Sequence, residues 1–241
     1  MHSWTEIGAD LNSPILIVAD HASAYVPNRI DLGIRPGLLA THIAVDIGVA
    51  DLSTELGSRL DCPVIFAGVS RLVIDFNRDS TDEALIPLKS DGHIIPGNVI
   101  DEVERQYRIA EYWQPYHDRV AHWIARSQPL LIVSVHSFTP QLASAPDEAR
   151  PWDIGILYNR DDRAACIAIP QLVQQGLCVG DQLPYSGVLL NATMNRHAEG
   201  NGIAYLGVEV RQDGISDRAG VARWAAILAP IVRAVSGDLA A

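Results

Sequence analysis

The sequence contains few cysteines and lacks any long hydrophobic run. Its three cysteines, Cys62, Cys166 and Cys178, are scattered and form no C-x-x-C pair, which excludes a disulfide framework and favours thiols in a reducing compartment. No stretch approaches ~18 uninterrupted apolar residues, and the first residues have neither the basic nor the apolar region of a secretory leader. We therefore expect a cytoplasmic protein that does not associate with membranes.

Basic residues are also scarce, since 18 Lys and Arg stand against 29 Asp and Glu, a formal net charge of −11. Nucleic acids and anionic membrane surfaces select basic patches, so this balance argues against both as partners. We expect a small-molecule substrate, and an anionic substrate would need a local arginine cluster that acts against the overall field. The sequence leaves the oligomeric state open.

Short apolar runs alternate with helical patterns along the 241 residues. This alternation predicts a three-layer α/β fold, in which a mostly parallel sheet carries helices on both faces, and the length suits a single domain over residues 1–241. Strands are predicted at residues 14–19, 63–68, 71–76, 130–135, 153–158 and 205–210. Helices are predicted at residues 37–60, 99–126, 162–176 and 217–235, with a kink at Pro115 in the second and a long loop at 79–98.

Polar side chains stand at the ends of four predicted strands. Ligands of open α/β sheets bind in the crevice outside the carboxyl ends of the strands, so we expect these side chains to meet at one edge. Two histidines and a carboxylate near one point form a common site for a catalytic zinc, which keeps one position for water. The sequence therefore predicts a divalent metal, with zinc expected. The polar strand ends are Asp20 with His21, Asn77 with Arg78, His136, and Glu209 with Arg211.

The third metal ligand is less defined than the two histidines His21 and His136. Asp46 is the preferred carboxylate, because a charge within an apolar helix is costly unless something pairs it. His42 lies four residues earlier, on the same face of the predicted helix, and is either a neighbour or a rival ligand. Asp20 could orient the ring of His21 instead of binding metal. A lone histidine at a strand end is more often a hydrogen-bonded core residue, so the site depends on both rings meeting.

Glu209 is the candidate general base. It lies between two valines that strand alternation places on the opposite face, and a carboxylate beside an activated water is suited to accept its proton. The alternative is a simple salt bridge with Arg211. Guanidinium groups can grip a substrate carboxylate through two parallel hydrogen bonds, and the Gly- and Asn-rich loop 191–200 could also reach the substrate. The predicted substrate-binding residues are Arg71, Asn77, Arg78, His197 and Arg211.

Six motifs of this chain, in this order, resemble the N-formylglutamate amidohydrolase (deformylase) family. They are "VADHASAYVP", "HIAVDIG", "SRLVIDFNRD", "SVHSFTP", "DQLPYSG" and "VEVRQD", and the resemblance spans residues 14–215. It implies a fold related to zinc-dependent exopeptidases, a divalent metal, and hydrolysis of an N-acyl, typically N-formyl, amino acid.

The resemblance also implies roles for particular residues. It suggests metal at His21 and His136, the substrate carboxylate at Asn77 and Arg78, and the base at Glu209. The chain departs from a carboxypeptidase-type site, which has a glutamate three residues after its first histidine, because that position is Ala24. The carboxylate ligand must therefore come from elsewhere in the chain.

Two other functions remain open at the level of sequence. One is a metallo-exopeptidase or deacylase that acts on a different amide. The other is a non-catalytic protein of the same fold that uses its arginines to bind a small carboxylate.

Overall fold

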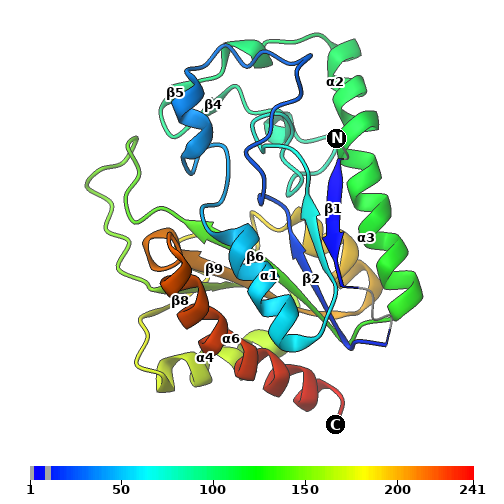
Figure 1. Cartoon of the computed structure of the whole chain (residues 1–241), viewed down its shortest axis with the longest axis vertical. Helices are drawn as coiled ribbons and strands as arrows, with labels where there is room; N and C mark the ends of the chain where they lie inside the picture. Colours follow the sequence, from blue (N-terminus) through cyan, green and yellow to red (C-terminus); the bar gives the residue numbers. More distant parts are fainter. Residues whose placement is uncertain (1–2, 9–11) are drawn as a thin grey trace.

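The computed structural model describes residues 3–8 and 12–241, and a seven-stranded sheet runs through its centre (Figure 1). The strands are β1 (Trp4–Ile7), β2 (Ile15–Ala19), β3 (Val64–Ala67), β6 (Leu131–Phe138), β7 (Ile154–Leu157), β8 (Val179–Asp181) and β9 (Ala204–Arg211). Their order is β1-β3-β2-β6-β9-β7-β8. Neighbours are parallel except at β1-β3 and β9-β7, which confirms the predicted mostly parallel sheet.

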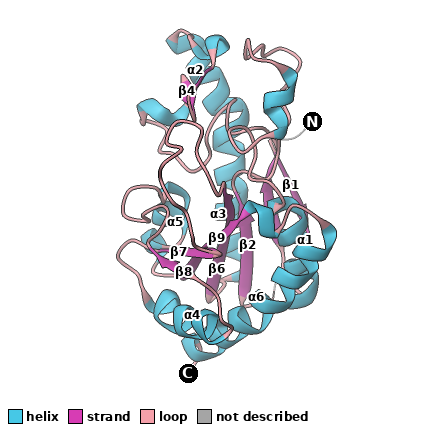
Figure 2. Ribbon diagram, turned by 90° about the vertical axis from the view of Figure 1, so that its left-hand side faces the viewer, coloured by secondary structure: helices cyan, strands magenta, loops and turns pink. Residues whose placement is uncertain are grey.

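Helices cover both faces of this sheet, which confirms the predicted three-layer fold (Figures 1 and 2). Helices α1 (Val49–Leu60), α4 (Arg163–Gln174) and α6 (Arg218–Leu239) pack on one face. Helices α3 (Gln114–Ser127) and α5 (Ala192–His197) pack on the other. Each face of the sheet carries its own hydrophobic core, and alternate side chains of β2 point into each. Ile15 and Ile17 belong to the core under α1, α4 and α6, and Leu16 and Val18 belong to the core under α3 and α5.

Shorter elements complete the chain, several of them within the predicted loop 79–98. They are η1 (Pro36–Ala40), η2 (Glu83–Leu85), β4 (Lys89–Ser90), β5 (His93–Ile94), η3 (Pro96–Asn98), α2 (Glu102–Arg108), η4 (Ile109–Trp113), η5 (Glu199–Asn201) and η6 (Gln212–Gly214). Strands β4 and β5 form a separate antiparallel pair. The predicted helix 99–126 is α2, a π-helical turn η4 and α3 in succession, and Pro115 lies directly after the π-helical turn, at the second residue of α3.

Helix α6 is long and apolar enough to cross a membrane by length and composition alone, with 22 residues and a hydropathy of 1.3. Half of its apolar 18-residue window is buried inside the protein, and its residues Val221, Trp224 and Leu228 belong to the core on the α1 side of the sheet. A core helix passes the same composition test, and the packing of α6 is that of a core helix.

The predicted strand 71–76 is wrong, although its apolar residues are buried. Its backbone forms turns, because local side chains satisfy the groups that a sheet ladder would use. Ser70 Oγ accepts a hydrogen bond from Leu72 N at 3.2 Å and donates to Ala44 O at 2.7 Å. The Asn98 side chain donates to Leu72 O at 2.8 Å. The segment is thus a buried loop that runs toward the carboxyl edge of the sheet.

The predicted helix 37–60 begins only at Val49, because the chain before it cannot continue as a helix. Residues Pro36–Ala40 form one 3-10 turn, and Gly48 at the N-cap of α1 has a φ of 79°. A Cβ at Gly48 would lie 2.1 Å from the carbonyl oxygen of Ile215. Both the backbone conformation and the close approach therefore require glycine there.

We expect Gly48→Ala to lower the free energy of unfolding by about 2 kcal/mol or more, since it adds backbone strain to overpacking. Gly237→Ala is the matched control, because a Cβ at Gly237 in α6 would meet nothing within 4 Å. That change should leave stability unaltered or raise it by roughly 0.5–1 kcal/mol. Urea denaturation of both variants measures the difference, and equal stabilities would contradict this account of Gly48.

Candidate metal centre

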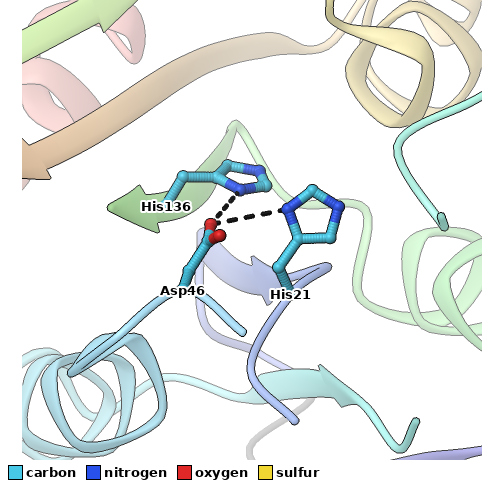
Figure 3. A group of neighbouring side chains, drawn as sticks. All are labelled: His21, Asp46 and His136. Carbon is cyan, nitrogen blue, oxygen red and sulfur yellow. Dashed lines mark hydrogen bonds and ion pairs between the residues drawn. The ribbon is translucent and has the colours of Figure 1, made fainter. Parts of the chain in front are cut away.

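Three side chains from distant parts of the sequence meet at the carboxyl edge of the sheet. His21 follows β2, His136 lies near the end of β6, and Asp46 lies in the turn before α1. All three are buried, and one ligand atom from each lies within 4.8 Å of the others. Figure 3 shows both rings directed at the Asp46 carboxylate. The structure therefore brings together the three predicted metal-binding residues.

Both imidazole rings have the same surroundings on their two nitrogens. Nδ1 faces Asp46 Oδ2, at 3.4 Å for His21 and 2.9 Å for His136. Nε2 faces a second carboxylate, which is Asp75 Oδ1 at 2.7 Å for His21 and Asp20 Oδ2 at 3.7 Å for His136. A metal-binding histidine commonly turns its other nitrogen to a carboxylate in this way, which fixes the ring and raises its basicity.

The Asp46 carboxylate is held from several directions. Arg71 Nη1 lies 3.4 Å from Asp46 Oδ1, and the Ser137 N–H donates to Oδ2 at 3.3 Å. The backbone N–H of Asp46 donates to the carbonyl of His21 at 2.9 Å, which ties its turn to the end of β2. Asp46 lies in a turn, so the helical face that it was predicted to share with His42 does not exist. Its position in the cluster is nevertheless as predicted.

Opposite charges dominate the electrostatics of the cluster. Burial alone would raise the pKa of Asp46, but the His21 and His136 rings hold it well below its ordinary value. Burial would lower the pKa of His136, yet the carboxylates of Asp20 and Asp46 raise it well above its usual range. Burial and the charge of Arg71 lower the pKa of His21. Asp75 and Asp46 have the larger, opposite effect, so the pKa of His21 is raised above its ordinary value. Without metal, both rings are therefore protonated more readily than a free histidine.

Asp75 and Asp20 form a second layer behind the histidines. Asp75 was not assigned from the sequence, and Asp20 was expected to orient the ring of His21, whereas Asp20 faces the ring of His136. Asp75 also accepts from Arg71 Nη2 at 2.9 Å, and Asp20 accepts from the Tyr116 hydroxyl at 2.5 Å. Burial raises the pKa of Asp20, but His136 and Tyr116 lower it to about 2. Asp75 was missed because the apolar run 71–76 was assigned to a strand. A carboxylate inside such an apolar run does indicate a buried, paired charge.

Glu209 shares a cavity with this cluster. In the register of β9 and β6 it lies beside His136. Its side chain is buried, and Oε2 has no hydrogen-bond partner among the residues described. Burial and the charge of Asp46 raise the pKa of Glu209 to about 7, against the lowering effect of His136, His21 and Arg71. The alternative salt bridge of Glu209 with Arg211 is not present in the described part of the chain.

The cavity has a volume of about 180 Å³ and opens beside the cluster. This is below the ~300–1,000 Å³ typical for drug-sized ligands, which suits a small metabolite. Three of the five predicted substrate-binding residues line it, and His42 lines it as well, with Nε2 2.9 Å from Asp91 Oδ2. The lining residues are His21, His42, Asp46, Arg71, Asp75, Asn77, Arg78, His136, Ser137, Phe138, Thr139, Tyr185, Leu190 and Glu209.

Two predicted substrate-binding residues, His197 and Arg211, do not line the cavity. His197 is buried with Nε2 2.8 Å from His117 Nδ1, and burial lowers its pKa to about 4, so it packs as a neutral core residue. Arg211 donates from Nε to Asp213 Oδ1 at 2.8 Å at the far end of β9. Strand alternation places Arg211 on the same face as Glu209, but its guanidinium pairs with Asp213 on η6 and not with a group in the cavity.

The donor set fits a divalent metal. It offers two imidazole nitrogens and a carboxylate oxygen, the ligand types of a catalytic zinc that keeps an open position. His21 Nδ1 is buried without a hydrogen-bond partner among the described residues, although it faces the centre of the cluster. The opposite nitrogens already face carboxylates. A metal at this centre would satisfy His21 Nδ1, whereas His136 Nε2, which also has no hydrogen-bond partner among the described residues, faces Asp20 Oδ2 at 3.7 Å.

Fold and cavity define an α/β protein with a candidate metal centre at the sheet edge, and comparison with known proteins gives its family. The family model for N-formylglutamate amidohydrolase matches residues 13–216. The chain therefore belongs to the N-formylglutamate amidohydrolase family, as its motifs predicted, and this membership supports an amidohydrolase. A search of curated proteins gives no significant match.

Solved structures share the fold over nearly the whole chain. The gene product Atu2144 from Agrobacterium tumefaciens is 29% identical with a TM-score of 0.94, and the match covers 100% of this chain and 97% of that one. An N-formylglutamate amidohydrolase from Ralstonia eutropha JMP134 is 18% identical with a TM-score of 0.70, covering 99% and 98%. A bacteriophage poly-gamma-glutamate hydrolase is 9% identical with a TM-score of 0.50, covering 98% and 91%. The last two likenesses show the fold alone.

The raised pKa values of His21 and His136 predict the pH dependence of stability in the metal-free protein. A raised folded-state pKa stabilises the fold fully below the unfolded value, about 6.5 for histidine, and this contribution is lost as pH rises through the folded value. We expect the free energy of unfolding to fall as the pH rises above about 6.5, by at most ~1.4 kcal/mol per pH unit for each histidine. Urea denaturation with a chelator present measures this slope.

Two further arms make this measurement specific. Glu209, with its pKa raised to about 7, acts in the same direction below that pH, so the decisive range lies above it. His136→Gln removes one titrating ring and should flatten the slope. Added zinc should reverse the trend, because metal binds deprotonated imidazole. A metal-free stability that rises with pH over this range would show that the rings are not stabilised in their charged form.

Proposed function

We propose that this protein is a metal-dependent amidohydrolase that removes the N-formyl group from N-formylglutamate or a similar N-acyl amino acid. One observation carries this proposal: a candidate three-ligand centre and a buried, unpartnered glutamate line the same small cavity. Family membership supports the reaction type. The free state of the described cysteines is compatible with a cytoplasmic location, which we retain as part of the proposal.

The metal would be held by His21, His136 and Asp46, with zinc as the expected ion. When bound, such an ion supplies Lewis-acid chemistry, since it polarises a carbonyl oxygen and acidifies water. Asp75 and Asp20 would hold the two rings in place from behind, and Arg71 would hold Asp46 and Asp75. Arg71 therefore acts mainly as a counterion for the ligand carboxylates, because two of its N–H groups are engaged there.

Glu209 would carry the proton during hydrolysis. It accepts a proton from the attacking water as the water oxygen bonds to the acyl carbon. It then gives that proton to the amine nitrogen as the carbon–nitrogen bond breaks, which yields formate and the free amino acid. A pKa of about 7 is well matched to both steps at neutral pH.

Arg78 would bind the substrate carboxylate. It lines the cavity, and its guanidinium has no hydrogen bond or ion pair to the residues that the structure describes. Asn77 lines the cavity beside it and is fixed by a hydrogen bond from Thr193 N to Asn77 Oδ1 at 3.1 Å. A guanidinium that is free to form two parallel hydrogen bonds would place the acyl carbon of a small substrate against the metal centre.

We expect Glu209→Gln to lower kcat about 10²–10⁴-fold, because the amide cannot accept the proton of water. Steady-state assays of the zinc-loaded enzyme with N-formylglutamate, N-formylglutamine, N-acetylglutamate and a dipeptide would measure this and define the acyl group. Elemental analysis is the control, since the variant must keep its metal. A metal-loaded, folded variant with the native rate would refute the role of Glu209, and a wild-type enzyme inactive on every N-formyl substrate would refute the proposed function.

Arg78→Ala should raise KM about tenfold to a hundredfold with a smaller effect on kcat, because a lost charge-assisted pair costs roughly 1.5–3 kcal/mol. Arg211→Ala is the matched control, since it removes a guanidinium that lies outside the cavity and pairs with Asp213. Its KM should stay within about twofold of the native value. Equal KM values for the two variants would show that the carboxylate binds elsewhere.

A further inference from the structure

Tyr185 lines the cavity on a loop between β8 and α5, and it has no role in the steps assigned to Glu209 and Arg78. The loop is closely fixed to the sheet. A Cβ at Gly155 in β7 or at Gly180 in β8 would lie 2.2 Å or 2.4 Å from the carbonyl oxygen of Leu183, so two glycines make room for this backbone. The side chain of Gln182 bonds to the Tyr158 carbonyl and accepts from Gly187 N at 2.8 Å. Tyr185 is therefore presented by a preorganised loop.

A buried arginine stands behind Tyr185. The Arg150 side chain is 3% exposed, its Nη1 donates to the Tyr185 hydroxyl oxygen at 3.1 Å, and its Cζ lies 5.1 Å from the ring centroid. Nη1 also reaches the carbonyl of Thr139 at 3.4 Å. Arg150 Nη2 forms a loose ion pair with Glu148 Oε1 at 3.9 Å, and that carboxylate is 54% exposed. Nε has no partner among the described residues, so much of this buried charge acts on Tyr185.

This contact determines what the Tyr185 hydroxyl can do. Because Arg150 donates to the oxygen, the phenolic proton stays available for an acceptor in the cavity. Burial and the negative charge of Glu209 raise the pKa of Tyr185 despite Arg150, which keeps that proton in place at neutral pH. A cation behind a hydroxyl strengthens it as a donor, most of all in a site of low dielectric. The cavity thus contains a fixed, polarised donor beside the proposed base.

We propose that Tyr185 is a further catalytic residue, which donates a hydrogen bond to the acyl oxygen of the substrate as negative charge develops there, and that Arg150 is its positioning residue. The inference rests on the proposed function. When water attacks the acyl carbon, the electrons of the C=O bond move to oxygen, and they return when the carbon–nitrogen bond breaks. A donor already fixed at that place stabilises the transition state more than the bound substrate.

Tyr185→Phe tests this role because it removes one oxygen and keeps the ring. We expect kcat to fall about 10²–10³-fold, the usual effect of losing one such donor, with KM within about threefold. Zinc affinity, measured by chelator competition, should be unchanged. Tyr158→Phe is the matched control, since its hydroxyl donates to Asp181 at 2.9 Å outside the cavity, and it should retain the native kcat. An unchanged kcat in Tyr185→Phe, or a raised KM alone, would overturn the catalytic role.

A double-variant cycle tests the role of Arg150. Arg150→Met should lower kcat at least tenfold in the native background and have almost no further effect in Tyr185→Phe, because it acts through that hydroxyl. Losses that multiply would overturn the positioning role. If Arg150→Met fails to fold, Arg150→Lys, which keeps the charge, serves in the same cycle. A native enzyme that hydrolyses N-formyl amino acids while Tyr185→Phe is equally fast refutes this inference alone, whereas an inactive native enzyme refutes the proposed function with it.

Discussion

The carboxylate of Asp46 between two imidazole rings is the interaction on which the rest of the cavity depends. A buried carboxylate is costly unless it is paired and hydrogen-bonded, and Asp46 has His21, His136, Arg71 and the Ser137 N–H around it. These partners come from three separate segments of the chain, so the pairing also fixes where those segments meet. Removing one member of such a buried set typically costs about 3–5 kcal/mol, because the remaining charge is left uncompensated.

A second set of charges keeps this centre in place. Asp75 connects His21 to Arg71, and Asp20 connects His136 to the hydroxyl of Tyr116 on α3. The network therefore extends from the candidate metal centre to the helix layer on one face of the sheet. Each ring has its orientation fixed before any metal binds, which reduces the reorganisation that binding would require. Sheet, helix and loop thus contribute to one rigid polar cluster, although the cluster is small.

The sequence allowed the fold and most of this centre to be predicted, because both follow from local patterns. Apolar runs located five strands of the sheet, and polar residues at the ends of the predicted strands located His21 and His136. The error at residues 71–76 arose because burial alone does not distinguish a strand from a loop whose backbone is satisfied by side chains. The short strands β1 and β8 lack a strong apolar run. The position of Arg211 depended on an aspartate two residues later, a local contact that strand alternation does not predict.

The same side chains that would hold the metal also set the strength of the proposed base. The charge of Asp46 raises the pKa of Glu209, whereas His136, His21 and Arg71 lower it, and burial outweighs them all. Any change at the candidate metal centre therefore alters the proton affinity of Glu209, even where no atom of Glu209 moves. Arg78 is different, because its guanidinium is free of these pairs and only contributes a charge at the cavity wall. Substrate recognition can thus vary through Arg78, while the candidate metal centre and the proposed base are constrained to change together.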